Sequence, residues 1–361
     1  MNRIIQLDTA KAICIILVVI GHYIPGNSPS WYVMLHDIIY TFHMPLFMFA
    51  SGYIYIATKK EISYKSFIVK KFKRLMIPYF STSLIIIGIK ILSQGNLSVD
   101  NPVTSLSFIK MFYLPEAGYF LWFIWALWWI FMLIPLMKTP QIRSLFFLLC
   151  LIVTFIPFTL PEEFCINQCK KMIVFFMFGI FTNENKYLSK VITRTSTYQT
   201  FLTCLLFIIA EVYFLSYPSH HYNNEIIYKI ISFILPYLGI LFVIEISKLI
   251  CRYKTIGNNN LILNISASSY IIYLFHTTFE GFTKAIVSKL SLNEGNIYTF
   301  SLEALIIILS GIMGPMILYK YVLKRWDITK FLFGLSKSLF KFCLVTFLSP
   351  PVSPFPQLNR T

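Results

Sequence analysis

Three ionisable residues in the first apolar run of the chain could do chemistry together: Asp8, Lys11 and His22. Eleven positions separate Lys11 from His22, close to three helical turns, so a helix would place both on one face about 16 Å apart along its axis. Asp8 lies within i,i+3 reach of Lys11. A neutral histidine can take a proton from a hydroxyl group, and an ammonium group binds anions. The spacing therefore predicts a polar path along one side of a helix.

A simpler interpretation places these residues at the two ends of a membrane span. Asp8 and Lys11 would then mark one boundary, and His22 would lie in the opposite headgroup region. The polar path instead requires the side chains to face the interior of a helix bundle, because ionisable groups facing lipid are costly.

A second histidine, His43, lies in an apolar stretch just before Pro45. Histidine exchanges protons near neutral pH, so His43 is a second catalytic candidate. Pro45 frees a backbone carbonyl, and Ser51 with Gly52 permits close helix approach, so a packing role for this stretch is equally open.

Aromatic residues and a third histidine could line the same cavity. His276 follows Tyr270 and Tyr273 in an apolar run and is a candidate for substrate binding or for packing. Trp122 opens a tryptophan-rich segment that could stack on a sugar ring, although tryptophans near the end of a span more often form an interfacial belt.

The seven cysteines give no metal-binding pattern, because no CxxC pair and no histidine cluster accompanies them. We expect no metal cofactor. Cys165 and Cys169 are close enough in sequence to form a disulfide in an oxidising compartment, but unpaired thiols are the favoured interpretation.

The composition indicates a protein that the lipid bilayer solvates. Of the 361 residues, 57% are hydrophobic and 13% are charged, about half the charged fraction of an average soluble domain. The formal net charge of +16 comes from Lys and Arg between apolar runs, while the aromatic residues lie within those runs. No interleaved basic and aromatic surface remains for nucleic acid, so we expect no nucleic-acid partner.

The apolar runs predict an all-α, polytopic membrane protein of about ten transmembrane helices. The expected helices are 10–25, 37–57, 77–93, 118–137, 144–160, 171–183, 199–217, 228–249, 264–284 and 298–323. We expect one membrane domain over residues 1–345 and a disordered, Pro-rich tail over 346–361.

The distribution of Lys and Arg predicts the orientation. Cations fill the loop between the second and third predicted helices, from Lys59 to Arg74, and recur at every second loop, whereas the preceding loop, 25–32, has none. Cytoplasmic loops carry the excess of Lys and Arg, so both termini are predicted to be cytoplasmic.

The chain also resembles the membrane-bound acyltransferase 3 family, and most closely its fucose 4-O-acetylase-like branch of stand-alone sugar O-acetyltransferases. The resemblance rests on ordered motifs over most of the chain: Leu-Asp-Thr-Ala-Lys (7–11) with His22, His-Met-Pro-Leu-Phe (43–47), Ser-Gly-Tyr (51–53), Lys-Lys-Phe-Lys-Arg (70–74), Leu-Trp-Phe (121–123) and Ser-Tyr-Ile-Ile-Tyr-Leu-Phe-His (269–276).

The resemblance implies a ten-helix core that takes an acyl-CoA on its cytoplasmic side and a hydroxyl acceptor on its outer side. Lys11 and His22 match the family's Arg/Lys-x10-His pattern, and Lys71 and Arg74 match its cytoplasmic Arg-x-x-Arg pair. Lys11 and Lys71 are lysines where arginine is commoner, which keeps the charge and loses the bidentate geometry.

Together these observations predict O-acyl transfer, with acetyl transfer foremost, from acyl-CoA to a hydroxyl of a cell-surface or lipid-linked glycan in a bacterial-type inner membrane. His22 is the expected base and His43 a second catalytic candidate. Lys11, Lys71 and Arg74 are expected to hold coenzyme A, and Asp8, Trp122 and His276 to contact the acceptor. A transporter or flippase for a glycan or lipid is the alternative, because a polar stripe also suits a substrate pathway.

Overall fold

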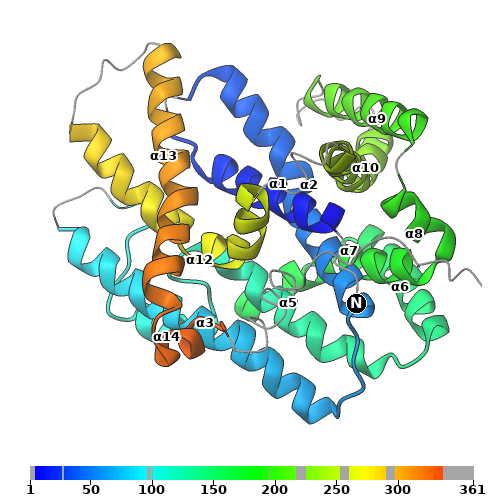
Figure 1. The fold of residues 1–361 in the computed structure, drawn as a ribbon, viewed down its shortest axis with the longest axis horizontal. Helices are drawn as coiled ribbons and strands as arrows, with labels where there is room; N and C mark the ends of the chain where they lie inside the picture. The colour runs from blue at the N-terminus through cyan, green and yellow to red at the C-terminus, as the bar shows by residue number, and fades with distance from the viewer. Residues whose placement is uncertain are drawn as a thin grey trace, which may run out of the picture.

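The computed structural model describes residues 5–26, 28–95, 99, 101–194, 196–216, 225–252, 260–289 and 297–335, and all regular structure within these ranges is helical. The long helices pack into one bundle (Figure 1). In chain order the elements are α1 (Ile5–His22), α2 (Ser30–Ala57), α3 (Tyr64–Ser93), α4 (Ser107–Lys110), η1 (Tyr119–Leu121), α5 (Trp122–Leu133), η2 (Ile134–Leu136), α6 (Pro140–Phe155), η3 (Glu163–Cys165), α7 (Ile166–Glu184), α8 (Lys186–Thr193), α9 (Thr197–Ser216), α10 (Glu225–Arg252), α12 (Asn260–Lys289), α13 (Ile297–Leu318), η5 (Tyr319–Leu323) and α14 (Asp327–Leu332).

The prediction of an all-α, polytopic membrane protein is confirmed. Eight helical segments of the described chain are long and apolar enough to cross a bilayer. The remaining two predicted ranges fall on α6, a shorter apolar helix of 16 residues, and on α12, which has 30 residues. Each predicted apolar range therefore coincides with a helix.

Large apolar side chains face outward on the peripheral helices. They include Leu145, Leu148 and Ile152 on α6, Phe201, Ile208 and Ile209 on α9, and Leu302, Leu305 and Leu309 on α13. Soluble monomers rarely expose contiguous apolar surfaces of this kind. These faces are suited to contact with lipid.

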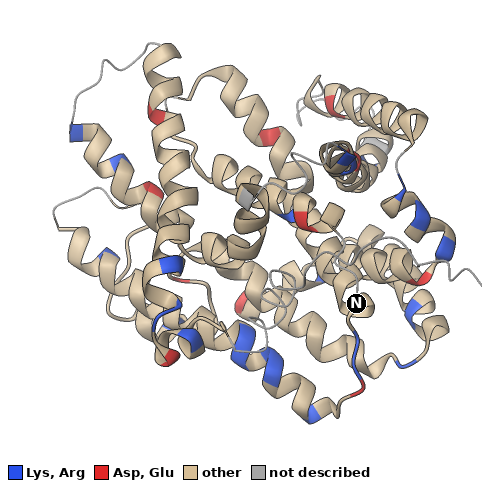
Figure 2. Ribbon diagram, in the orientation of Figure 1, with Lys and Arg blue, Asp and Glu red and all other residues tan. Residues whose placement is uncertain are grey.

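The third predicted helix, 77–93, begins too late. In the structure α3 starts at Tyr64, where the Ser63 hydroxyl accepts a hydrogen bond from the Ser66 amide and caps the helix. The first three turns carry five cations, which lower the hydropathy and led to their assignment as a loop. Figure 2 shows these cations along the first half of α3. They are therefore arranged with helical periodicity rather than spread over a loop.

Two glycines bring α2 and α7 into direct backbone contact. A Cβ atom at Gly52 would overlap the Phe176 carbonyl group, and one at Gly179 would overlap the Phe49 carbonyl group. Small residues of this kind allow helices to pack closely in membranes. The prediction that Gly52 permits close helix approach is confirmed.

Helices α1 and α12 run side by side in the same direction through the centre of the bundle. Ser266 donates a hydrogen bond to Asp8 at 3.3 Å near the start of both helices. Further along both helices, the rings of His22 and His276 stack. This pair of parallel helices connects the two ends of the candidate site.

The carboxyl-terminal part of the described chain folds back against α3. After α13 the chain continues through η5 to α14, and Gly334 adopts a φ of +66° where it meets the Arg74 backbone. The left-handed conformation favours glycine at this contact. The predicted tail, 346–361, lies outside the described residues.

Candidate active site

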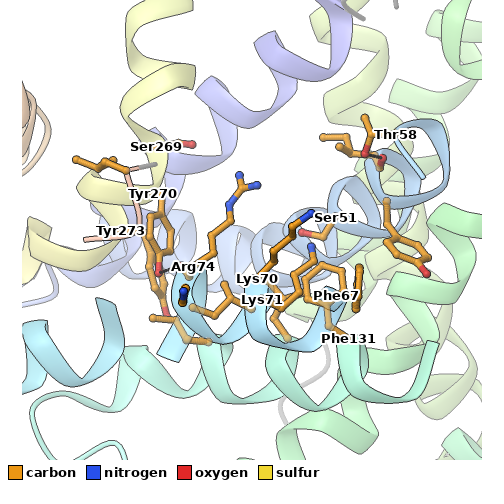
Figure 3. A pocket seen from close by; sticks show the side chains of 18 of the residues that line it. Ser51, Thr58, Phe67, Lys70, Lys71, Arg74, Phe131, Ser269, Tyr270 and Tyr273 are labelled. Carbon is orange, nitrogen blue, oxygen red and sulfur yellow. Dashed lines mark hydrogen bonds between the residues drawn. The ribbon is translucent and has the colours of Figure 1, made fainter. Parts of the chain in front are cut away.

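A large cationic pocket opens between α1, α2, α3, α5, α12 and the segment from η5 to Leu335. Its volume is about 1840 Å³. Figure 3 shows Lys70 and Arg74 extending from α3 into this space, with Tyr270 and Tyr273 of α12 on one side and Ser51 and Thr58 of α2 on the other. The lining carries ten cations and two acids: Lys11, Lys59, Lys60, Lys70, Lys71, Lys73, Arg74, Lys138, Lys324 and Lys330, with Glu61 and Asp327.

The charge balance of the pocket favours a polyanionic ligand. Lys59, Lys138 and Lys324 come from separate loops, each predicted for the cytoplasmic side of the membrane, and the structure brings them to this one pocket. Clustered ammonium and guanidinium groups bind phosphate groups through charge-assisted hydrogen bonds. The arrangement agrees with the prediction that these loops lie on the same side of the membrane.

Lys71 and Arg74 line the pocket from α3. The Lys71 ammonium group lies 3.3 Å from the centroid of the Phe131 ring, a cation–π contact. The Arg74 side chain extends freely into the pocket, while its backbone carbonyl accepts a hydrogen bond from the Tyr270 hydroxyl at 3.2 Å. The guanidinium group of Arg74 is therefore presented to a ligand by α12 as well as by α3.

Lys11 lines the pocket from α1. Its ammonium group pairs with Asp8 at 3.2 Å, and Asp8 also accepts the hydrogen bond from Ser266. Asp8 itself does not line the pocket. The carboxylate thus orients Lys11, and the structure gives no support for Asp8 as a direct contact to a substrate.

Aromatic rings close the inner end of the pocket. Phe123 and Tyr273 line it there, and the Tyr273 hydroxyl donates a hydrogen bond to the Phe120 carbonyl at 2.5 Å. The Phe120 ring lies 5.9 Å from the Tyr273 ring and 5.2 Å from the His276 ring, between centroids. A single layer of rings therefore connects the cationic pocket to the histidines beyond it.

Beyond this layer, His22 of α1 and His276 of α12 form a stacked pair. Their ring centroids are 4.9 Å apart and their planes are 27° apart. Phe120 packs edge-on against both rings. The sequence analysis predicted that His22 and His276 line the same cavity, and in the structure their rings are in contact.

The hydrogen bonds of His276 define its neutral tautomer. Its Nδ1 atom lies 2.9 Å from the Tyr273 carbonyl and 3.1 Å from the Ile272 carbonyl. Carbonyl groups only accept, so Nδ1 carries the proton and Nε2 presents a lone pair. That Nε2 atom is buried and has no hydrogen-bond partner among the described residues. A substrate hydroxyl is a donor that would satisfy it.

His22 is oriented by Tyr40 of α2. The Tyr40 hydroxyl lies 3.1 Å from His22 Nδ1. When Nδ1 donates to the tyrosine oxygen, Nε2 of His22 is left as a proton acceptor. His36 stacks on the opposite part of Tyr40, with centroids 4.1 Å apart, and pairs with Asp37. A polar chain thus leads from His22 to the exposed end of α2.

His43 belongs to the wall of the site. It is buried, and its Nδ1 donates to the Ile39 carbonyl at 2.8 Å. Its ring lies 4.7 Å from the Tyr40 ring, between centroids. Tyr40 thus contacts both His43 and His22, through its ring and its hydroxyl respectively.

The structure does not bring Trp122 to the pocket. Its ring packs edge-on against Phe123, whose side chain occupies the lining position. The neighbouring tryptophans support packing: Trp125 contacts Tyr79, and Trp129 donates a hydrogen bond to the Phe164 carbonyl at 2.9 Å. These contacts favour the structural interpretation of the tryptophans.

Hydrogen bonds from the first turn of α7 fix the position of η1, the short helix that contains Phe120. Gln168 donates to both Glu162 and the Tyr119 hydroxyl at 2.6 Å, and Asn167 donates to Glu162 at 2.7 Å. These hydrogen bonds, from Gln168 first and Asn167 second, lower the pKa of the Glu162 carboxyl below its usual value. The neighbouring Cys165 and Cys169 are buried, free thiols.

Two residues of the site, Glu280 and Tyr40, are absent from the sequence prediction. Glu280 is buried on α12, four positions after His276. The signal was available, because an ionisable residue within an apolar run is a functional candidate. Other buried charges have structural partners in the described chain: Arg143 pairs with Glu184, and Lys248 with Glu245.

Comparison with known proteins agrees with this architecture. The family model of the acyltransferase 3 domain, described as an acyltransferase domain, matches residues 4–320. This chain belongs to the acyltransferase 3 family. The match covers α1 and α12, which carry His22 and His276. It also covers every cation of the pocket lining except Lys324 and Lys330.

Two curated relatives are similar to parts of the chain, and both are called nodulation protein NolL. The protein from Mesorhizobium japonicum is 29% identical over 236 residues, which cover 63% of this chain and 60% of the relative. The protein from Sinorhizobium fredii is 38% identical over 82 residues, 21% of this chain and 22% of that relative. The chain thus matches at most 60% of the length of either relative. No solved structure matches.

Proposed function

We propose that this acyltransferase 3 protein is a membrane O-acyltransferase that transfers an acetyl group from acetyl-CoA to a hydroxyl of a cell-surface or lipid-linked glycan. The observation that carries the proposal is the stacked pair of His22 and His276, which contacts Phe120, the ring that also packs against Tyr273 in the lining of the cationic pocket. A thioester donor with a phosphorylated head fits such a site from one side, and a hydroxyl acceptor can meet it from the other.

The head of coenzyme A is assigned to the wide part of the pocket. Lys71 and Arg74 of α3 and Lys11 of α1 would contact its phosphate groups, since cations outnumber acids five to one in the lining. The elongated arm would then follow α1 toward the histidines. Lys11 and His22 are about 16 Å apart along a helix axis, a separation that an extended arm can span.

In the proposed reaction, His22 Nε2 takes the proton of the acceptor hydroxyl as its oxygen attacks the thioester carbonyl. The new bond is between the hydroxyl oxygen and the acyl carbon, and the bond from that carbon to the coenzyme A sulfur breaks. The proton passes from His22 to the departing thiolate. The products are an O-acyl ester and free coenzyme A, so the step is redox-neutral and needs no oxidant.

The roles of the other residues follow from their contacts. The Tyr40 oxygen can accept a hydrogen bond from His22 Nδ1, the arrangement that leaves Nε2 free to take a proton, and His276 Nε2 can accept a hydrogen bond from the same acceptor hydroxyl. Phe120 packs against both rings and limits access of water to the thioester. Both termini are assigned to the cytoplasm and the protein to the bacterial inner membrane, on the distribution of its cations.

The test uses purified protein in lipid nanodiscs with acetyl-CoA labelled in the acetyl group. The acceptors are methyl glycosides of fucose, rhamnose, galactose, glucose and N-acetylglucosamine. The proposal predicts label in an ester of at least one sugar and release of free thiol in equal amount. The transporter alternative would be supported by two results together: no label is transferred to any sugar, and the same protein moves a fluorescent lipid-linked sugar between leaflets.

A further inference from the structure

The buried carboxyl group of Glu280 has no role in the acyl transfer just described, although it lies next to the histidine pair. Glu280 is 6% exposed and is one helical turn beyond His276 on α12. A Cβ atom placed on Gly311 would lie 2.8 Å from Glu280 Oε1 and 2.9 Å from Val19, which precedes His22 by one turn. The carboxyl group therefore occupies the junction of α1, α12 and α13.

One oxygen of this carboxyl group lacks a partner. Oε1 is buried and makes no hydrogen bond within the described part of the chain. An unsatisfied buried polar group costs about 1–3 kcal/mol, and such groups in native proteins usually have a functional explanation. A ligand that donates hydrogen bonds at this position would remove the cost.

The surroundings of Glu280 combine hydroxyl groups and aromatic rings. The Tyr32 hydroxyl donates a hydrogen bond to the Ile20 carbonyl at 2.9 Å, one residue from Val19 at this junction. Tyr32 also belongs to an aromatic cluster with Trp31 and Phe300, with centroid separations of 5.2 to 6.2 Å. Trp31 is 40% exposed, so this cluster reaches the surface.

The chemistry of this region matches a sugar. A carboxyl group with a free oxygen can bind the hydroxyl groups of a pyranose, and aromatic side chains provide an apolar surface for its C–H face. A lipid chain would leave Oε1 unsatisfied, and a phosphate group would be repelled by a carboxylate. The groups present favour a neutral sugar with a hydroxyl next to the one that is acylated.

We propose that Glu280 is the acceptor-binding residue: it accepts a hydrogen bond from a neighbouring hydroxyl of the sugar and so directs the reactive hydroxyl toward His22 and His276. The aromatic cluster of Trp31, Tyr32 and Phe300 packs against the sugar ring at the outer end. This inference rests on the proposed acyl transfer, and it names the residue that selects the acceptor.

The experiment measures acetyl transfer to the same panel of methyl glycosides and to their monodeoxy forms. Glu280→Ala is expected to raise the acceptor KM at least tenfold and to leave the KM for acetyl-CoA within twofold. In the wild type, the deoxy sugar that lacks the contacted hydroxyl loses much of its activity, because a site that binds a hydroxyl rejects the analogue without it. In Glu280→Ala, activity on the same deoxy sugar should be almost equal to activity on the parent sugar.

Glu211→Ala is the matched control. Glu211 is also buried and also has one unpaired carboxylate oxygen, but it lies on α9 and accepts its hydrogen bond from Thr41. We expect its acceptor KM to equal that of the wild type. Binding of tritiated coenzyme A to each variant shows that the fold and the donor pocket are intact. If Glu280→Ala does not fold, Glu280→Gln is used, with a smaller rise in acceptor KM expected.

Two results would overturn the inference separately. If the deoxy sugar loses the same fraction of activity in the wild type and in the Glu280 variant, this residue does not bind the acceptor. A fall in kcat at constant acceptor KM would exclude acceptor binding as well. Absence of acetyl transfer by the wild type would remove the proposed function as a whole, and that result is distinguishable because no variant is needed to see it.

Discussion

His22 and His276 stack with their ring centroids 4.9 Å apart, although 254 positions separate them in the sequence (276 − 22). The contact joins α1 to α12, the two helices that also meet through Asp8 and Ser266 at the cationic end of the bundle. One pair of parallel helices thus carries the residues proposed for phosphate binding at one level and those proposed for proton transfer at another. The following predictions test this arrangement.

Replacement of His276 distinguishes a chemical role from a packing role. In His276→Asn the side-chain amide can still donate to the Tyr273 carbonyl, as Nδ1 does now, but the lone pair of Nε2 is gone. We expect acetyl transfer to fall by about 100-fold or more, in the range for loss of a proton-transfer group. If His276 only packs, the Asn variant would keep wild-type kcat, as measured by acetyl transfer in nanodiscs.

Removal of either Lys71 or Arg74 should weaken donor binding. Lys71→Ala and Arg74→Ala each lose a charged contact worth about 1.5–3 kcal/mol. We therefore expect the KM for acetyl-CoA to rise by about 10-fold or more in each variant. Higher ionic strength should raise the wild-type KM as well, because salt screens the charges.

Lys190→Ala is the control for these two variants, because it also removes a lysine but lies on α8 and does not line the pocket. Its KM for acetyl-CoA should match that of the wild type. An equal change in all three variants would mean that overall charge, rather than the pocket, determines donor binding.

The contact between α2 and α7 should be intolerant of added volume. Gly52→Ala places a methyl group on the Phe176 carbonyl and should destabilise the protein by about 1–3 kcal/mol. Gly88→Ala on α3 has nothing within 4 Å of the new Cβ and should be neutral or stabilise by about 0.5–1 kcal/mol. Thermal unfolding in detergent measures both, and a Gly52 variant as stable as the Gly88 variant would contradict the close contact.

The Phe120 ring should protect the thioester from water. Phe120 packs against both histidines and against Tyr273 at the end of the pocket. In Phe120→Ala we expect several-fold faster hydrolysis of acetyl-CoA without acceptor, because water can reach the histidine pair. Phe112→Ala, at an exposed ring that packs on Phe80, is the control. Slower hydrolysis in Phe120→Ala would mean that the ring aligns the donor instead.

The sequence predicted the helices well because lipid imposes long apolar runs. The predicted start of α3 was too late, because residues 65–74, which carry five cations, form the first helical turns of α3. Hydropathy cannot distinguish a basic loop from a basic helix end. Both give the same charge pattern, and only the cap at Ser63 marks the true beginning.

The candidate site was predicted in part, residue by residue. The spacing of Lys11 and His22 predicted one helix face. In the structure Lys11 pairs with Asp8, which accepts the hydrogen bond from Ser266 of α12, and His22 stacks on His276 of the same helix. The stack of two histidines depends on which distant helices become neighbours, and one sequence does not contain that information.

Glu280 illustrates a different reason for a missed residue. It is a single acid in an apolar run, like Glu211, and only its spacing of four residues from His276 distinguishes it in the sequence. Only the packing of α12 against α1 and α13 gives Glu280 its position. Trp122 shows the reverse, because a plausible sugar-binding ring turned away from the pocket and Phe123 took its place.

The most direct test of the account is the rate of acetyl transfer by His22→Gln, measured beside its affinity for acetyl-CoA on the same nanodisc samples. We predict an affinity within about twofold of the wild type, because His22 does not line the donor pocket, and a transfer rate lower by about 100-fold or more. A variant that transfers acetyl groups at the wild-type rate would contradict the assignment of His22 as the base.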